Sequence, residues 1–146
     1  MSQKPITLQT LLEGLNRDLA HEFQAIMMYR LYASLVTGPM RSELREFFSG
    51  EITEELGHAQ VLADKIAALG GTPTTTVPPF ELTRDPKRML ENVLQAERET
   101  IERYKERRLQ AQELGDIALV VQLENIIAEE QVHHDEVRQM LENWPY

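Results

Sequence analysis

The sequence predicts an all-α protein, an antiparallel four-helix bundle with one long crossover between its second and third helices. Two observations support this fold class. The seven prolines leave three long proline-free windows, at 6–38, 40–72 and 87–144. Proline breaks helices because it lacks an amide hydrogen and its ring clashes with the preceding turn. Within the windows, apolar residues recur at spacings of three and four, which places them on one helix face. We expect residues 1–146 to form a single domain.

Turn and capping residues predict where each helix begins and ends. Gly38-Pro39 predicts a tight turn, and Gly70-Gly71-Thr72-Pro73 predicts the end of a helix. Asp85-Pro86 predicts an N-cap followed by proline at the first helical position, and Gly115-Asp116 predicts a break between two helices. They predict helices over residues 7–37, 40–69, 86–113 and 116–142. The segment at about 71–85 is rich in Thr and Pro and has no periodicity, so it is the expected crossover, with the second and third helices parallel. The sequence shows no obvious tandem repeat.

Composition excludes several classes of function. The chain has 146 residues, 24 acidic against 15 basic side chains, a net charge of −9 and no cysteine. Disulfide scaffolds, zinc fingers, thiolate-held clusters and cysteine nucleophiles are therefore excluded. The negative charge opposes binding to a polyanion and suits a protein that attracts cations. No apolar run approaches the ~18 residues of a membrane span, and the N-terminus lacks the apolar region of a secretory signal. We expect a cytoplasmic protein.

A carboxylate interrupts each of the four apolar stripes near its middle, at Glu22, Glu55, Glu97 and Glu130. Two of these begin a Glu-x-x-His pattern that ends at His58 and His133. No Lys or Arg lies on the same stripes. Four unpaired carboxylates in one core would cost many kcal/mol, because buried charges must be paired, protonated or bound to metal. Two divalent cations would balance the four negative charges. The pattern therefore predicts a dimetal centre.

Taken singly, each of these residues has an ordinary structural interpretation. A lone Glu on an apolar stripe usually lies at its edge and reaches water, and a lone His is commonly hydrogen-bonded in a core or at a surface. The complete set favours the metal interpretation over a purely structural bundle. Carboxylate and imidazole ligands without thiolate suit Fe or Mn, and Zn can also bind.

This ligand pattern resembles that of the ferritin-like di-iron proteins, in which two helices each contribute a Glu and two contribute Glu-x-x-His. The resemblance covers nearly the whole chain and is greatest to the bacterioferritin and mini-ferritin branches. It implies two Fe ions per chain, held by Glu22, Glu55, His58, Glu97, Glu130 and His133. Glu55 and Glu130 would bridge the ions, and Glu22 and Glu97 would be terminal ligands. Tyr29 matches a tyrosine that bacterioferritins keep beside the metals; an ordinary core aromatic is the alternative.

Three departures from the family pattern indicate which features of the related proteins this chain is not expected to share. Leu56 stands where bacterioferritins carry a haem-ligating Met, so no haem is expected. Leu94 stands where rubrerythrins carry an additional Glu. The chain ends 13 residues after His133, without the short fifth helix of 24-subunit shells. We therefore expect a 12-subunit shell or a free dimer rather than a 24-subunit cage.

The resemblance implies a ferroxidase that oxidises Fe(II) with O₂ or H₂O₂ for iron storage or detoxification. The alternatives are a dimetal peroxidase, a manganese-catalase-like enzyme and a DNA-protecting mini-ferritin. Nucleic acid is not an expected partner, because the N-terminal segment offers only Lys4 and acidic residues dilute the basic cluster at Arg103, Lys105, Arg107 and Arg108. Apolar residues outside the core stripes predict at least a homodimer through the first two helices. They are Phe23, Met27, Met28, Leu31, Tyr32 and Leu35 on the first helix and Phe47 and Val61 on the second.

Four residues near the ligands are harder to interpret. Glu51 and Glu54 are candidate relay carboxylates, although a solvated helix face explains them more simply. Glu129 lies about 100° around the helix from Glu130 and is expected to face solvent. Gly57 inside the motif costs ~1 kcal/mol of helix stability relative to Ala, which would be explained by the close approach of another helix.

Overall fold

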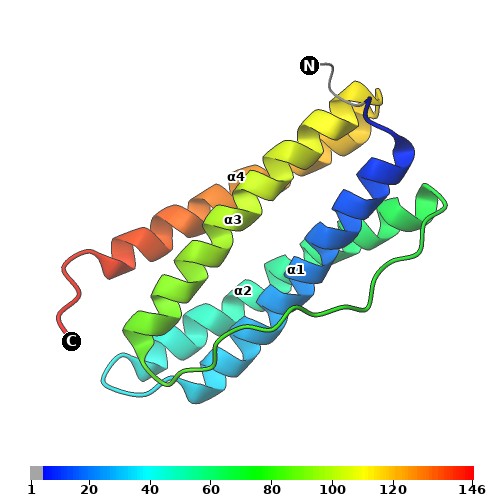
Figure 1. Cartoon of the computed structure of the whole chain (residues 1–146). Coiled ribbons are helices and arrows are strands. Elements are labelled where there is room, and N and C mark those ends of the chain that lie inside the picture. Colours follow the sequence, from blue (N-terminus) through cyan, green and yellow to red (C-terminus); the bar gives the residue numbers. More distant parts are fainter. Residues whose placement is uncertain (1–4) are drawn as a thin grey trace.

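The computed structural model of the chain describes residues 5–146, and Lys4 lies outside them. It contains four helices, α1 (Leu8–Leu35), α2 (Arg41–Ala68), α3 (Pro86–Glu113) and α4 (Ile117–Leu141), and no strand within the described residues. Figure 1 shows two hairpins, α1 with α2 and α3 with α4, packed side by side. The prediction of an all-α four-helix bundle is confirmed.

The crossover runs the length of the bundle and lies across α1, so α2 and α3 point in the same direction (Figure 1). Side chains of α1 hold this segment by hydrogen bonds to its backbone. Tyr32 donates to the carbonyl of Glu81 at 2.7 Å, and Gln24 donates to the carbonyl of Pro79 at 3.0 Å. These bonds satisfy backbone groups of a segment that has no secondary structure of its own.

The crossover changes the second apolar face that we expected on α1. Met28 and Tyr32 are buried in the core, and are therefore not part of an exposed surface. Met27 remains exposed on α1, together with Val77 and Leu82 of the crossover. No helix in the described range is long and apolar enough to cross a membrane.

The apolar core consists of two clusters separated by polar residues. One cluster contains Tyr29, Tyr32, Phe48 and residues near the α1–α2 turn, and the other contains Leu15, Leu62 and residues toward the α3–α4 turn. The six predicted ligands all lie within the buried interior of the bundle. Tight packing on both sides fixes their positions, because close-packed interiors leave side chains few alternative rotamers.

A cation is also buried in this core, contrary to the expectation from the apolar stripes. Arg107 is 1% exposed and forms a bidentate pair with Asp18, at 2.8 and 3.2 Å. Gln110 accepts a further hydrogen bond from the guanidinium at 2.6 Å. Gly14 makes room for this group, since a Cβ at that position would lie 1.9 Å from Arg107 Nη1. Arg107 thus neutralises Asp18, and it makes no ion pair with the four predicted carboxylate ligands.

Candidate metal centre

The middle turns of all four helices bring the six predicted ligands together in the bundle interior. α1 contributes Glu22, α3 contributes Glu97, and α2 and α4 each contribute a Glu and a His three residues apart. Residues three apart share a helix face, so both members of each Glu-x-x-His pair point inward. Each of the six side chains belongs to a residue that is at most 5% exposed.

The ligand atoms form two groups that share one residue. Oxygen and nitrogen atoms of Glu22, Glu55, His58 and Glu130 all lie within 4.8 Å of one another, and so do those of Glu97, Glu130 and His133. Glu130 belongs to both groups, so its carboxylate lies between the other ligand atoms of the two groups. Glu55, which the resemblance also implied as a bridge, belongs only to the first group.

Three buried polar atoms of these residues, Glu22 Oε2, Glu97 Oε2 and His133 Nδ1, have no hydrogen-bond partner within the described part of the chain. His58 Nδ1 and Glu130 Oε1 make no hydrogen bond of good geometry either, but they lie 3.1 Å apart and can form an ion pair. Buried polar atoms in folded proteins are almost always paired, and each unpaired group is costly. Carboxylate oxygens and imidazole nitrogens are ligands of Fe, Mn and Zn. This donor set fits a pair of divalent cations.

Burial and mutual repulsion raise the pKa of three carboxyl groups of the centre, those of Glu22, Glu55 and Glu97. Burial, together with the neighbouring Glu55, raises the pKa of Glu22 well above its usual value. Burial likewise raises the pKa of Glu55. Burial and the charge of Glu130 raise the pKa of Glu97 to about 8. Since metal ligands must be deprotonated, a cation that binds here must displace protons.

The surrounding carboxylates make both histidines more basic. Burial lowers the pKa of His58, but Glu130, Glu22 and Glu129 outweigh it and raise the value to about 9. Burial also lowers the pKa of His133, and Glu51 and other carboxylates raise it to about 9. Without a metal, positively charged imidazoles can therefore balance part of the negative charge of the centre.

Each histidine is held from outside the centre by a carboxylate of the opposite hairpin. His58 Nε2 lies 2.6 Å from Glu129 Oε2, and His133 Nε2 lies 2.6 Å from Glu54 Oε2. Glu51 Oε2 lies 2.9 Å from the same His133 nitrogen. When the outer nitrogen donates to a carboxylate, the inner nitrogen, Nδ1, keeps its lone pair for a metal.

This arrangement corrects two expectations about the flanking carboxylates. The Glu129 side chain is 48% exposed, as expected, yet its carboxylate reaches back to His58. Glu54 and Glu51 likewise contact His133, so a solvated helix face does not describe them fully. A glutamate has enough reach to contact a neighbouring helix from a position at the edge of the interface.

Two buried tyrosines each donate a hydrogen bond to a predicted ligand across the bundle. Tyr29 donates to Glu97 Oε1 at 2.9 Å, and Tyr104 donates to Glu22 Oε1 at 2.5 Å. In each carboxylate the other oxygen, Oε2, is the unpaired one. Tyr104 was missed in the sequence, although it follows Glu97 by the same seven residues that separate Tyr29 from Glu22.

The two hairpins therefore carry the same ligands and the same supporting residues at equivalent positions. The sequence thus contains an internal repeat that we did not expect. Five titratable residues of the first hairpin recur, each with the same type, 75 positions later in the second. The pairs are Glu22 and Glu97, Tyr29 and Tyr104, Glu54 and Glu129, Glu55 and Glu130, and His58 and His133. Five apolar residues also recur identically at the same spacing, namely Leu15, Leu19, Ile26, Leu44 and Ile52. Such apolar matches are common between any two amphipathic helices, so the signal of the five titratable pairs is hard to recognise in the sequence.

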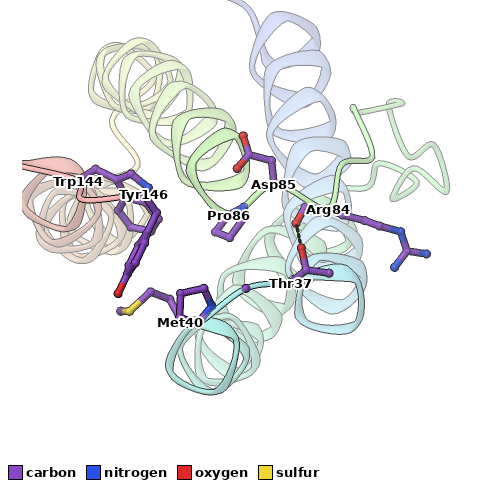
Figure 2. A pocket seen from close by; sticks show the side chains of 9 residues that line it. Thr37, Met40, Arg84, Asp85, Pro86, Trp144 and Tyr146 are labelled. Carbon is purple, nitrogen blue, oxygen red and sulfur yellow. Dashed lines mark hydrogen bonds between the residues drawn. The ribbon is translucent and has the colours of Figure 1, made fainter.

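A separate cavity of about 410 Å³ lies at one end of the bundle, between the α1–α2 turn, the start of α3 and the C-terminal tail (Figure 2). Met40, Trp144 and Tyr146 line it, with Asp85 as its single carboxylate side chain. Its lining contains no histidine. This cavity therefore lacks the ligand set found in the middle of the bundle.

Comparison with known proteins gives consistent matches. A family model described as the ferritin-like domain matches residues 12–145. A bacterioferritin from Rhodobacter capsulatus is 30% identical over 125 residues, which cover 85% of this chain and 78% of that protein. A nutrient stress-induced DNA-binding protein from Nostoc sp. (strain PCC 7120) is 31% identical over 135 residues, which cover 84% of this chain and 73% of that protein. The crystal structure of a ferritin-like, diiron-carboxylate protein from Bacillus anthracis superposes with a TM-score of 0.90 at 45% identity, covering 96% of this chain and 99% of that one.

Proposed function

The chain belongs to the ferritin-like family, and we propose that it is a ferroxidase that oxidises Fe(II) to Fe(III) for iron storage or detoxification. Two Fe(II) ions per chain would bind as substrate between the four helices. The observation that carries this proposal is the convergence of buried ligand atoms from Glu22, His58, Glu97, Glu130 and His133, of which Glu22 Oε2, Glu97 Oε2 and His133 Nδ1 have no hydrogen-bond partner within the described residues. A purely structural core would leave these three atoms unsatisfied at considerable cost.

The reaction balances with either oxidant. Two Fe(II) ions give up two electrons, and with two protons these reduce O₂ to H₂O₂ or reduce H₂O₂ to two molecules of water. The four carboxylates carry four negative charges when deprotonated, which stabilises the Fe(III) product more than Fe(II) because attraction grows with the charge of the ion. Carboxylate oxygens are also hard ligands that suit a highly charged cation.

The surrounding residues prepare the ligands for this chemistry. Tyr29 and Tyr104 each hold one oxygen of Glu97 and Glu22 by donating a hydrogen bond, which leaves the second oxygen free for a cation. Glu54 and Glu129 orient the two imidazoles through their outer nitrogens. Such outer partners fix ring orientation and increase ligand basicity.

DNA protection is the alternative suggested by the name of the Nostoc relative, but the charges on α3 do not favour it. Arg107 is buried against Asp18, and Lys105 and Arg108 pair with Glu102 and Glu124. The basic cluster read from the sequence is thus largely neutralised. With a net charge of −9, the chain also repels a polyanion in general.

We further propose that the protein assembles as at least a homodimer through the face shared by α1 and the crossover, as a free dimer or within a 12-subunit shell. A hollow of about 280 Å³ on this face is lined almost entirely by apolar side chains, including Met27, Leu31, Val77, Phe80 and Leu82. Contiguous exposed apolar surface of this kind is typical of an interaction site.

Stopped-flow oxidation of Fe(II) by the metal-free protein tests the proposed activity. Glu55→Ala, His58→Ala and Glu130→Ala are each expected to abolish the fast phase, because the ligands act as a unit. Glu129→Gln keeps the size of the side chain but weakens its hold on His58, and an intermediate loss is expected. Glu106→Ala removes an exposed carboxylate of α3 and serves as the control.

Two results would contradict the proposal. Oxidation by Glu130→Ala at the rate of the unmodified protein would show that the centre lies elsewhere. Manganese in the purified protein, together with rapid turnover of H₂O₂ and no oxidation of Fe(II), would favour the peroxidase or manganese-catalase-like alternative. Metal analysis with stoichiometry per chain separates these cases.

A further inference from the structure

The C-terminal tail closes the cavity of about 410 Å³ at the end of the bundle (Figure 2). Asn143 has a φ of 54°, in the left-handed region, which ends the helical path of α4 and redirects the chain. Trp144 and Tyr146 thereby reach the α1–α2 turn and the start of α3, whose Met40 and Pro86 line the same cavity. The volume of this end cavity lies in the range of small-molecule sites.

Aromatic and apolar side chains form most of the wall of the end cavity. The rings of Trp144 and Tyr146 lie edge to face, with their centroids 6.1 Å apart and their planes at 79°. Met40, Pro39 and Pro86 complete this wall. The face of an aromatic ring carries partial negative charge and attracts a cation within about 6 Å, most strongly when the ring is that of Trp.

The charge available to a ligand in the end cavity is negative. Asp85 is the N-cap residue of α3, yet its side chain accepts no capping hydrogen bond, so the carboxylate is free for another partner. Arg84 also lines the cavity, but its guanidinium points away from Trp144 and Tyr146 (Figure 2). No other charged side chain in the described residues belongs to the lining. The aromatic rings and the carboxylate therefore both favour a cation.

The walls also indicate which kind of cation fits. A primary ammonium group brings three N–H donors, whereas Met40, Pro39 and Pro86 offer no strong acceptor from their side chains. A donor that loses water without gaining an acceptor is costly. A quaternary ammonium group has no N–H donor, and its methyl groups can contact apolar and aromatic walls. Aromatic sites of this composition are used for such ligands.

We propose that the end cavity binds a small molecule that carries a quaternary ammonium group. Trp144 and Tyr146 contact its methyl groups, and Asp85 balances its charge. The net charge of −9 attracts cations to the chain and repels anions. The end cavity shares no residue with the candidate metal centre, so this inference does not depend on the proposed function.

Fluorescence titration of the purified protein with choline tests the site directly, because Trp144 is the single tryptophan of the chain. Choline should produce a saturable change in the emission. The comparison probe is the neutral tert-butyl analogue of choline, in which carbon replaces the nitrogen and the shape is kept. Choline should bind about tenfold more tightly than this analogue, since the attraction to the rings and to Asp85 acts only on the cation.

Three variants assign the binding to the named side chains. Asp85→Asn removes the charge and keeps a good N-cap residue; the affinity for choline should fall about fivefold, and the affinity for the analogue should not change. Tyr146→Ala alters a side chain that is 67% exposed, so the fold is kept, and the affinity should fall about threefold. Trp144→Leu should lower the affinity about tenfold, as measured from the methyl signal of choline by NMR.

Glu113→Gln is the matched control, because it removes an exposed carboxylate at the opposite end of α3. Its affinity for choline should equal that of the unmodified protein. A loss as large as that of Asp85→Asn would assign the effect to the net charge of the chain and refute the site. Equal binding of choline and its analogue would also refute it, because the cavity would then be merely apolar.

Benzoate tests the opposite charge at the same place. The positive end of the α3 dipole and Arg84 would favour an anion if Asp85 did not offset them. Tighter binding of benzoate than of choline would therefore overturn the proposal. So would the absence of a saturable change with choline, which is the result expected if a second copy of the chain covers the end cavity.

Discussion

Replacing Gly14 by alanine is expected to destabilise the protein, although alanine is the better helix former. The new Cβ would lie 1.9, 2.1 and 2.5 Å from three atoms of the Arg107 guanidinium. Ordinary contact begins near 3.5 Å, so this group would have to move by roughly 1.5 Å. Such a displacement cannot preserve two hydrogen bonds to Asp18 of 2.8 and 3.2 Å. Asp18 would then be left as a poorly paired buried carboxylate.

The magnitude follows from two opposing effects. Breaking a buried ion pair costs about 3–5 kcal/mol, and replacing glycine by alanine within a helix stabilises it by ~1 kcal/mol. The free energy of unfolding should therefore fall by about 2–4 kcal/mol. For a chain of this length, that corresponds to a decrease in Tm of roughly 5–15 °C. Asp18 and Arg107 lie one turn from Glu22 and Tyr104, so the loss also loosens α1 against α3 beside the centre.

Thermal and chemical denaturation of the metal-free protein measure this effect. Gly50→Ala is the control, because a Cβ there meets no atom within 4 Å and the position is exposed. That variant should gain up to ~1 kcal/mol from helix propensity alone. If Gly14→Ala proves as stable as Gly50→Ala, the buried ion pair does not depend on the missing side chain, and the reasoning is refuted.

Two further predictions concern pH and assembly. The pKa values of His58 and His133 are raised to about 9 by folding, so their contribution to stability is complete below about 6.5 and is lost as the pH rises through 9. The pKa of Glu97 is raised to about 8, so folding retains a proton that the unfolded chain releases near pH 4.5, and stability again falls as the pH rises toward 8. The Tm of the metal-free protein should therefore decrease between pH 5 and pH 9. If the Tm stays constant over this range in the presence of a chelator, the raised pKa values of the two histidines and of Glu97 are contradicted. Light scattering should give at least twice the chain mass of 16.8 kDa, whereas a monomer at micromolar concentration would exclude the proposed interface.

The helices and the six candidate ligands could be predicted from the sequence because the signals that specify them are local. Proline, glycine and capping residues act within a few positions of each helix end, and the four helices begin and end within two residues of the predicted bounds. A carboxylate such as Glu97 within an apolar stripe is visible without knowledge of the partner helix. The period of the helix alone places it toward the core.

Contacts between helices were decided only by the tertiary structure. The reach of Glu129 to His58, the bond from Tyr104 to Glu22 and the pair of Arg107 with Asp18 depend on which helices are neighbours and on how far each is shifted along its axis. A helix period assigns a direction to each side chain but does not specify the length or the partner of its contact. The space beside Gly57 depends on the same packing: a Cβ there would meet no atom within 4 Å, so the close approach of another helix that we expected is wrong. Residue types along the chain thus determined which ligands the candidate centre offers, and the packing of the two hairpins decided which neighbouring side chains support those ligands.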